Sequence, residues 1–258
     1  FDDERVIAGQ GTIGLELLEQ LPDLTFVAVP IGGGGLISGI AIALKTLKPG
    51  IRVIGVEAEA AASALASRNA GSVVHLESAE TIADGIAVKR IGDHTFPLIQ
   101  EYVDEIVTVN EEQTALAIHA LIERQKLVAE GAGAVCLAAL LAGKIHVSNN
   151  DIGVMIISGG NIDVNIIQRI IDRGLIREGG IGHLMVKMRH RPGSLARLTR
   201  MVAETGANVL EIGHRRAFAD ISVAEVEIVV HVETRGREHV QEIIAMLQKA
   251  GLKVEEDR

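Results

Sequence analysis

Four consecutive glycines, Gly32 to Gly35, stand between an apolar run at residues 25–30 and a helical pattern that begins at Leu36. Glycine permits positive φ and lets a ligand approach the backbone closely. The N–H groups of such a loop, with those of the first helical turn, form a nest that suits phosphate. A merely tight turn is the alternative, but ordering four glycines costs chain entropy. We therefore interpret this tetraglycine loop as a phosphate site.

A second cluster, Ser158-Gly159-Gly160-Asn161, follows another apolar run. Ser158 is expected at the carboxyl edge of a sheet, where α/β proteins bind ligands, and Asn161 can cap the next helix. By itself, this cluster is more simply a tight turn with a capping serine. Together with the tetraglycine loop, it predicts a site with a phosphate at one end and a neutral hydroxyl at the other.

A dinucleotide is a weaker alternative for the tetraglycine loop. Glu57 ends the next predicted strand about twenty residues on, where dinucleotide-binding folds carry an acidic residue. The G-x-G-x-x-G fingerprint fails, however, because its third glycine would fall on Ile37 or Ser38. An oxidoreductase is therefore disfavoured.

These residues must be positioned by alternating strands and helices in the first two thirds of the chain. Strands are predicted over residues 25–30, 52–56, 105–109 and 153–157. Helices are predicted over residues 36–48, 60–69, 95–102, 110–128, 131–141 and 161–173. This alternation is typical of an α/β fold with a parallel sheet covered on both faces.

The pattern changes after a glycine linker at Gly179-Gly180. Strands are then predicted over residues 184–188, 209–214, 223–232 and 252–255, and helices over 193–205 and 237–250. This βαββαβ order is that of a ferredoxin-like sandwich. We therefore expect two domains, residues 1–178 and 181–258.

The composition of the 258 residues excludes several classes of protein. With 48% hydrophobic and 23% charged residues, disorder is excluded, and a net charge of -9 argues against a nucleic-acid surface. The longest apolar stretch, around residues 134–142, is too short to span a membrane. The single cysteine, Cys136, favours a reducing compartment, so we expect a cytoplasmic protein.

Six motifs, taken in order, resemble the large domain of the threonine ammonia-lyases (threonine dehydratases). They are Ala8-Gly9-Gln10-Gly11-Thr12, Pro30-Ile31-Gly32-Gly33-Gly34-Gly35-Leu36, Val53-Ile54-Gly55-Val56-Glu57, Thr81-Ile82-Ala83-Asp84-Gly85, Glu130-Gly131-Ala132-Gly133-Ala134 and Ser158-Gly159-Gly160-Asn161-Ile162-Asp163. The resemblance implies a pyridoxal-phosphate enzyme of fold type II, akin to serine racemase. The last part of the chain, with Arg191-Pro192-Gly193-Ser194-Leu195 and Gly206-Ala207-Asn208-Val209, resembles an ACT regulatory domain. One such domain is typical of the medium-length threonine ammonia-lyases.

The resemblance implies a role for each motif at the cofactor. The tetraglycine loop would hold the phosphate, and Ser158 would hydrogen-bond the pyridine nitrogen. A hydroxyl leaves the ring a weaker electron sink than a carboxylate would, which suits β-elimination. Glu130 would orient polar groups near the ring, although a helix-start acid is an equal interpretation. The residues expected to bind the cofactor are Gly32, Gly33, Gly34, Gly35, Leu36, Gly85, Glu130, Ser158 and Gly159.

The implied reaction removes water from L-threonine, and from L-serine, and for threonine ends in 2-oxobutanoate and ammonia. The Schiff-base lysine of the family lies in a Ser-Phe-Lys-x-Arg-Gly motif upstream of the matching region, and the present sequence has no such motif. Lys45, Lys89, Lys126 and Lys144 are expected to be solvated surface charges. No catalytic residue is therefore assigned here. We expect a fragment or a processed chain that needs the missing part from elsewhere.

A cation site is a secondary expectation. In serine racemase, positions that match Glu57, the Ala61 carbonyl and Ser63 hold a divalent ion, with a carboxylate at the last position. A serine is a poorer ligand for a hard cation, and Glu57 is more simply a strand-end acid. A monovalent or divalent cation is therefore left open.

An amino-acid effector, isoleucine or valine, is expected in the ACT-like part. The loop of Arg191, Pro192, Gly193 and Ser194 precedes a helix, so its N–H groups could receive a carboxylate. Asn208 could bind the same effector. The simpler interpretation is a proline at the first helical position and a turn at Asn208. Because ACT domains pair, we expect a homo-oligomer, either a dimer or a tetramer.

Two further alternatives remain. One is a serine racemase or dehydratase of different specificity. The other is a non-catalytic, effector-binding protein that has kept the cofactor fold; the missing lysine favours it, and the intact glycine clusters disfavour it.

Overall fold

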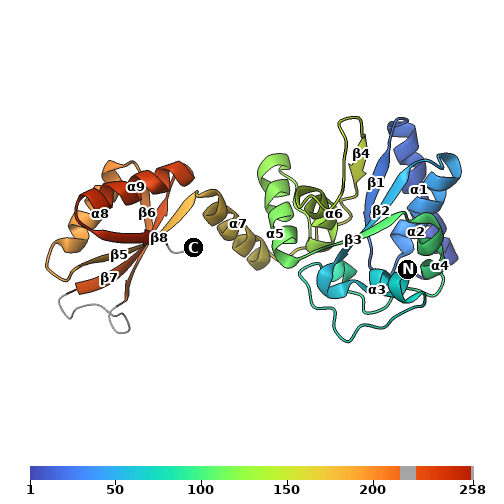
Figure 1. Cartoon of the computed structure of the whole chain (residues 1–258), viewed down its shortest axis with the longest axis horizontal. Coiled ribbons are helices and arrows are strands. Elements are labelled where there is room, and N and C mark those ends of the chain that lie inside the picture. Colours follow the sequence, from blue (N-terminus) through green and yellow to red (C-terminus); the bar gives the residue numbers. More distant parts are fainter. Residues whose placement is uncertain (216–224, 257–258) are drawn as a thin grey trace. The chain divides into compact units, whose positions relative to one another are not determined.

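The computed structural model describes residues 1–215 and 225–256, and the chain forms two compact units, residues 1–166 and 167–258 (Figure 1). The division falls within helix α7 (Val164–Glu178) rather than at Gly179-Gly180. The reason is that the end of α7 is bonded to the second unit. The Arg237 guanidinium donates to the Arg177 carbonyl at 3.0 Å, and Thr234 N donates to the Gly180 carbonyl at 2.8 Å.

A parallel sheet forms the centre of the first unit, as the sequence predicts. Its order is β3-β2-β1-β4, with β1 Phe26–Pro30, β2 Arg52–Ala58, β3 Glu105–Val109 and β4 Gly153–Met155. Every residue of the central strand β1 is buried, which explains its purely apolar sequence. Strand β4 is shorter than predicted, because beyond Met155 only the amide of Ile156 still bonds to β1, at the Ala28 carbonyl.

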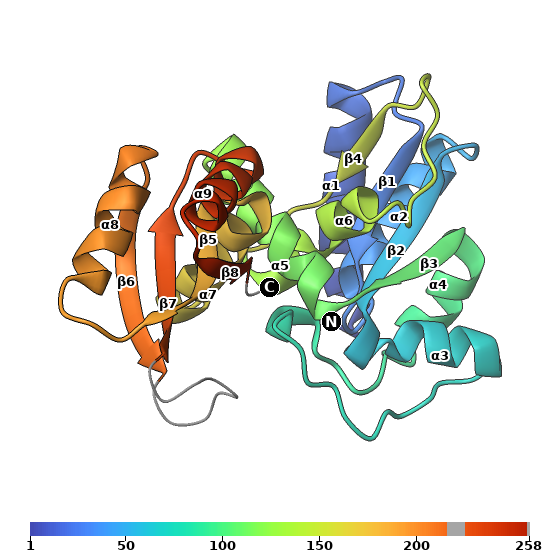
Figure 2. The same cartoon turned by 60° about the vertical axis from the view of Figure 1, so that its left-hand side comes forward.

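Helices cover both faces of this sheet. Helices α2 and α4 lie on one face with α1 packed outside α2, while α5 and α6 lie on the other face (Figures 1 and 2). Their bounds are α1 Glu4–Gln20, α2 Gly35–Leu47, α3 Ser63–Ala70, α4 Thr95–Tyr102, α5 Glu111–Ala120 and α6 Gly131–Leu141. Short 3-10 turns span η1 Glu59–Ala61 and η2 Asp84–Ile86. The core between the sheet and α2 and α4 is aliphatic, and includes Val27, Val29, Ile37, Ile40, Leu44 and Ile99.

Two helices of the first unit depart from the predictions. Helix α1 has no counterpart among the predicted elements. The helix predicted over residues 110–128 ends its α-helical part at Ala120, continues as a π turn, η3 (Leu121–Gln125), and stops at Lys126, where φ is +56°. The start of α5 follows the prediction, because Asn110 and Gln113 form a reciprocal capping box. Helix α6 is almost wholly buried and carries the fully buried Cys136.

The second unit has the predicted βαββαβ order. Its elements are β5 Ile181–Arg189, α8 Ser194–Glu204, β6 Asn208–Arg215, β7 Glu225–Glu233, α9 Arg237–Lys249 and β8 Lys253–Glu256. The sheet is antiparallel, in the order β6-β7-β5-β8. Alternate residues of β5 are buried under the two helices, beside Leu198, Val202, Ile243 and Leu247. The strand predicted over 223–232 starts in residues that lie outside the described ones.

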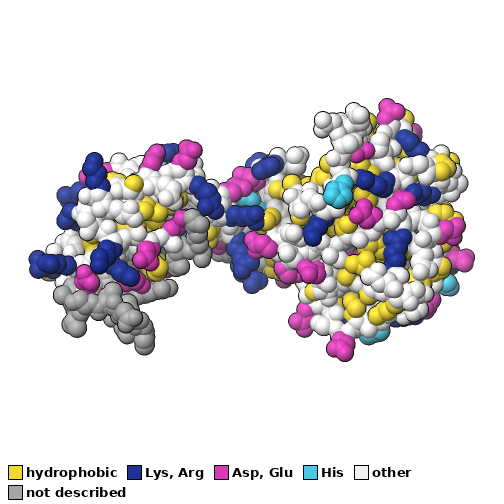
Figure 3. Space-filling model, in the orientation of Figure 1, with side chains coloured by type: hydrophobic (Ala, Val, Ile, Leu, Met, Phe, Trp, Pro, Cys, Tyr) yellow, Lys and Arg dark blue, Asp and Glu magenta, His cyan; other side chains and the backbone are white. Residues whose placement is uncertain are grey.

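The charges of the two units are mixed. On the face that Figure 3 shows, basic and acidic side chains are interspersed over both units. The net charge of -9 is therefore not gathered into one patch of that face. Among the residues that the structure describes, no helix is both long and apolar enough to cross a membrane.

Candidate active site

The tetraglycine loop links β1 to α2. Gly34 occupies the N-cap position of α2 in the left-handed region, with φ +93°, and Gly35 is the first helical residue. The carbonyl of Gly33 accepts two hydrogen bonds, from the Thr95 hydroxyl at 2.7 Å and from the Gly92 amide at 3.2 Å. The first N–H groups of a helix have no carbonyl acceptor one turn earlier. The start of α2 therefore offers donors to an anion.

Contacts within the chain account for the glycines of this loop. A Cβ atom at Gly33 would collide with the Phe1 ring, and one at Gly34 would lie 2.8 Å from the Thr95 Cβ. A Cβ at Gly35 would lie 2.6 Å from the Phe1 carbonyl oxygen. The sequence argument attributed these glycines to a phosphate in preference to a tight turn. The packing shows that their small size is also required by the fold itself.

A cavity of about 700 Å³ joins the two glycine clusters. Gly35 and Leu36 line it from the start of α2, and Ser158 lines it from the segment after β4. The strands before both segments are parallel neighbours, so their carboxyl ends meet at one edge of the sheet. A second cavity, of about 550 Å³ between α1, α2 and α4, contains none of the predicted cofactor residues.

Glu130, Gly85 and Gly159 also come together. The Glu130 amide donates to the Gly159 carbonyl at 3.1 Å, and its carboxylate accepts from the Asn161 amide at 3.1 Å. A Cβ at Gly85 would lie 3.1 Å from the same carboxylate, and a Cβ at Gly159 would collide with it. Glu130 is the N-cap residue of α6, but its side chain makes no cap hydrogen bond to that helix. It holds the loop after Ser158 instead.

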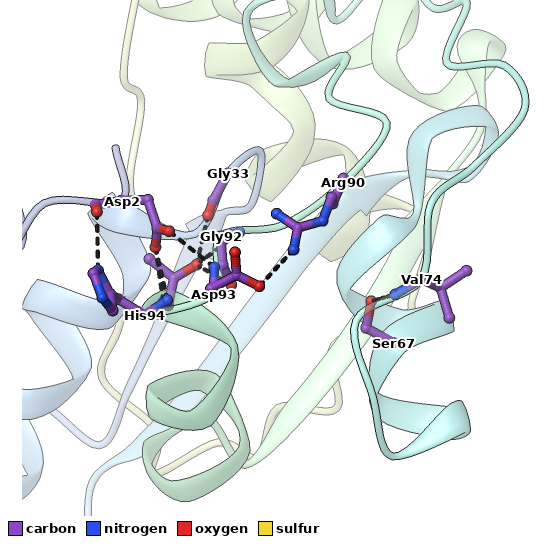
Figure 4. A network of polar contacts seen from close by, with 9 residues as sticks. Asp2, Gly33, Ser67, Val74, Arg90, Gly92, Asp93 and His94 are labelled. Atoms are coloured by element: carbon purple, nitrogen blue, oxygen red, sulfur yellow. Dashed lines mark hydrogen bonds and ion pairs between the residues drawn. The ribbon is translucent and has the colours of Figure 1, made fainter.

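Sequence reasoning missed the residues that brace the tetraglycine loop from α4. The Asp2 carboxylate accepts from the amides of Asp93 and His94 at 2.9 and 3.0 Å (Figure 4). Thr95 is fully buried, and its amide donates to the same carboxylate at 3.1 Å. Thr95 is 62 residues from Gly33 in sequence. No local pattern marks such a pair, because each residue alone is typical of an ordinary helix start.

The residues expected at a cation site fit a helix cap better. Glu57 is fully buried, and its two carboxylate oxygens accept the amides of Ala64 and Leu65 at 2.8 and 2.9 Å, at the start of α3. Burial raises the pKa of Glu57 to about 7. The Ser63 hydroxyl is buried and, in the described part of the chain, has no hydrogen-bond partner. Glu57 thus acts as a helix cap, and the neutral Ser63 is a weak ligand for a hard cation, so a cation at Glu57, Ala61 and Ser63 stays a prediction.

The residues expected to share one effector lie apart. Asn208 pairs with Glu233, which pairs with Ile181 at the start of β5, whereas Arg191 and Ser194 follow the end of β5. At about 3.3 Å per residue, the length of β5 separates them by roughly 25 Å. The expectation that Asn208 and the Arg191–Ser194 loop contact the same ligand within one chain is therefore wrong. The distance depends on the direction of the strands, which the two motifs do not encode.

The Arg191–Ser194 loop is an exposed turn. The Ser194 amide donates to the Arg191 carbonyl at 3.1 Å, and Gly193 has φ +86°. Pro192 precedes Gly193 and is exposed as well. Asn208 donates to the Glu233 carboxylate at 3.3 Å.

The lysines considered from the sequence do not line the cavity described above. Lys89, Lys126 and Lys144 are exposed, as expected. Lys45 differs, because its side chain is only 18% exposed and pairs with Asp104 at 2.7 Å. Lys45 is therefore a paired, partly buried charge, held by Asp104 in the segment before β3.

Comparison with known proteins identifies the family. Residues 1–159 match the model described as pyridoxal-phosphate dependent enzyme. L-threonine ammonia-lyase of Geobacter sulfurreducens is 49% identical over 255 residues, which is 99% of this chain and 63% of that protein. The crystal structure of a threonine deaminase from T.th. has 45% identity and a TM-score of 0.60, and covers 63% of this chain and 61% of its own.

A serine racemase is similar as well. The maize enzyme has 37% identity and a TM-score of 0.58, over 67% of this chain and 54% of that chain. The present chain thus spans less than two thirds of the length of each of these relatives. Because the family model covers more than half of the 258 residues, including the tetraglycine loop, Ser158 and Gly159, this chain belongs to the pyridoxal-phosphate dependent enzyme family.

Proposed function

We propose that this chain is the cofactor-binding and regulatory part of a pyridoxal-phosphate dependent ammonia-lyase that acts on L-threonine, and on L-serine. One observation carries the proposal: Gly35, Leu36 and Ser158 border a single cavity at the carboxyl edge of a parallel sheet. The similarity to an L-threonine ammonia-lyase over 99% of this chain supports the choice of substrate. The fully buried Cys136 is compatible with a reducing, cytoplasmic location.

The phosphate group would bind at the tetraglycine loop. Gly32 to Gly35 and Leu36 lead into the N-terminus of α2, where backbone amides and the helix dipole favour a doubly charged anion. The 13 residues of α2 provide an uninterrupted helix behind this nest. These amides bind and orient; they take no part in proton transfer.

Ser158 would face the ring nitrogen at the other end. When bound, the cofactor withdraws electrons from the Cα atom of the substrate, which is the chemistry that it supplies. A neutral hydroxyl beside the ring nitrogen moderates that withdrawal. This suits β-elimination, in which the β-hydroxyl leaves at once as water. The product of threonine then hydrolyses to 2-oxobutanoate and ammonia.

Glu130 would orient Ser158. Its amide binds the Gly159 carbonyl and its carboxylate binds the Asn161 amide, on either side of Gly160. Gly85 lies against the same carboxylate. The group that takes the Cα proton is not assigned to this chain, and a lysine from a segment outside it would supply that step.

Turnover of L-threonine by the gene product that contains this chain tests the proposal. We expect an absorbance band of bound cofactor, and formation of 2-oxobutanoate when L-threonine is added. Ser158→Ala should lower kcat/KM, while Ser148→Ala, at an exposed loop, should not. Absence of both the band and the product would contradict the lyase function. Formation of D-serine from L-serine would favour the serine racemase alternative.

The second unit is proposed as an ACT regulatory domain that binds isoleucine or valine in a homo-oligomer. Its βαββαβ order supports this proposal. Because Arg191 and Asn208 lie roughly 25 Å apart along one chain, an effector that contacts both needs two copies. Arg191→Ala and Asn208→Ala should each reduce isoleucine binding, and a mixture of the two variants should recover part of it. Failure of the mixture to recover any binding would contradict a site shared between copies.

A non-catalytic protein is the remaining alternative. Isoleucine binding in a gene product that forms no 2-oxobutanoate would favour it. A shift of the threonine saturation curve by isoleucine would favour the regulated enzyme.

A further inference from the structure

The Gly33 carbonyl is the most firmly held group of the tetraglycine loop. The Thr95 hydroxyl donates to it at 2.7 Å and the Gly92 amide at 3.2 Å. Thr95 is fully buried at the first position of α4. In Figure 4 the carbonyl oxygen of Gly33 points towards Gly92. Both donors therefore come from the segment that leads into α4.

Fixing this carbonyl also fixes the next amide. The peptide between Gly33 and Gly34 is trans, so its C=O and N–H point in opposite directions. With the Gly33 oxygen directed at Thr95, the Gly34 N–H is turned away from α4. Gly34 itself holds a left-handed conformation, with φ +93°, that few other residues adopt easily. The direction of the first amide of the anion nest is thus set by Thr95.

A second layer of contacts holds Thr95. The Asp2 carboxylate accepts the amides of Asp93, His94 and Thr95, and the Asp2 carbonyl lies 3.1 Å from His94 Nδ1 (Figure 4). A Cβ at Gly92 would collide with the same carboxylate. Asp2 therefore holds the backbone at the start of α4, from which the Thr95 hydroxyl reaches the Gly33 carbonyl.

We propose that Thr95 is a positioning residue that orients the tetraglycine loop for a phosphate ester, and that Asp2 holds Thr95 in place. The inference deepens the proposed function and rests on it, because the phosphate is the group being positioned. A purely structural role would stabilise the fold without affecting the phosphate. The two roles differ in their effect on a ligand that lacks a phosphate. Loss of the Thr95 hydroxyl weakens the binding of such a ligand only if the role of Thr95 is structural.

Thr114 offers a matched control. It is 2% exposed, and its hydroxyl donates to the backbone carbonyl of Asn110 at 3.0 Å near the start of α5. Thr114→Val thus removes a buried hydroxyl from a backbone carbonyl, as Thr95→Val does, but away from the loop. Thr95→Ser keeps the hydroxyl and serves as the rescue variant.

Pyridoxine 5'-phosphate is the probe. It lacks the aldehyde that would react with a lysine, so its binding does not depend on the lysine that this chain lacks. Its dissociation constant is measured by calorimetry on the cofactor-free gene product that contains this chain, beside that of pyridoxine. We expect Thr95→Val to weaken binding of the phosphate ester by roughly five- to tenfold, the effect of one lost hydrogen bond. Thr95→Ser and Thr114→Val should stay within about twofold of the wild type. Pyridoxine should bind all four proteins equally.

Amide hydrogen exchange provides a readout without ligand. Exchange at Gly34 and Gly35 should be faster in Thr95→Val and unchanged in Thr114→Val. Equal affinity of Thr95→Val and the wild type for the phosphate ester would overturn the inference alone. An equal loss for pyridoxine would overturn it in favour of a structural role. A wild-type gene product that does not bind the phosphate ester would contradict the proposed function itself, and the inference with it.

Discussion

Two strand-to-helix turns of this molecule look alike in sequence and are held differently. Gly34, before α2, has φ +93°, and Gly193, before α8, has φ +86°. A Cβ at Gly34 would lie 2.8 Å from the Thr95 Cβ, whereas no atom of the described residues lies within 4 Å of a Cβ at Gly193. The sequence suggested an anion site at each of these two turns. A glycine before a helix indicates a built site only where another element closes around it.

The starts of the helices show a similar contrast in how carboxylates hold them. In the first unit, Asp2 holds the start of α4 and Glu57 holds the start of α3. In the second unit, α8 begins at Gly193 without a side-chain cap. The starts of α3 and α4 are therefore held by carboxylates from outside each helix, whereas the start of α8 is held by its own local turn.

Gly34→Ala should destabilise the protein clearly more than Gly193→Ala. A left-handed alanine costs about 1 kcal/mol at either site, and overpacking against Thr95 adds about 2 kcal/mol at Gly34 only. Urea unfolding, followed by amide signals of each unit in NMR spectra, measures the two losses. Similar losses in the free energy of unfolding would mean that the contact with Thr95 adds nothing to the cost of a side chain at Gly34.

The buried carboxyl of Glu57 should make the stability of the first unit depend on pH. Its folded-state pKa of about 7 is raised from 4.5 by burial, so the unfolded state ionises first as the pH rises. The free energy of unfolding should fall by up to about 3 kcal/mol between pH 4.5 and 7 and then level off. Below pH 4.5 the carboxyl is protonated in both states, and this loss is absent.

Glu57→Gln should lack that slope, and Glu233→Gln in the exposed β7 end should retain it. Thermal unfolding across the pH range gives the comparison. A wild-type stability that rises relative to Glu57→Gln over this window would mean that the α3 amides, or a bound cation, outweigh the cost of burying the charge.

Loss of the Asp2 carboxylate should have a smaller effect. Asp2→Ala leaves three amides at the start of α4 without an acceptor and should cost about 2 kcal/mol, at the upper end for a helix cap. Asp3→Ala removes a local cap of α1, at the Arg5 amide 2.9 Å away, and should cost about 1 kcal/mol. A greater loss for Asp3→Ala would reverse the ranking of distant and local caps.

Asp2→Asn gives a finer test of the same contact. The Asp2 carbonyl and then its carboxylate raise the pKa of His94. Because Asp2→Asn removes only the charge, it should lower that pKa in part, as an NMR titration of His94 would measure. An unchanged pKa of His94 would mean that the charge of Asp2 does not contribute to it.

The smallest effect is expected at Asn208. Its exposed contact, to the Glu233 carboxylate at 3.3 Å, gives Asn208→Ala a change within about 0.5 kcal/mol in the free energy of unfolding. A loss comparable to that of Asp2→Ala would show that the Asn208 side chain also braces the start of β6.

The sequence revealed elements whose own pattern decides their structure. The apolar run of β1, the capping box at Asn110 and the two glycine clusters all have local signals. Helix α1 was missed because glycine is unfavourable within helices. Here glycine is needed for contact between helices: a Cβ at Gly14 would lie 3.0 Å from the Ile40 carbonyl oxygen of α2.

The contacts around the site could be identified only from the folded structure. Thr95 meets Gly33 across 62 residues, and Asp2 meets Thr95 across 93. The separation of Asn208 from Arg191 depends on strand direction, which residue types do not carry. Local sequence patterns thus identified the tetraglycine loop as a backbone segment that would face a ligand. Only the tertiary contacts identified Thr95 and Asp2 as the residues that hold this loop.

Cys136 gives the first unit an internal reporter. It is the single thiol of the sequence, it is fully buried in α6, and burial raises its pKa. A reagent that reacts with thiolates can therefore modify Cys136 only when α6 separates from the sheet. The rate at which the thiol is labelled then measures how often the face of the sheet opposite α2 opens, without any introduced probe.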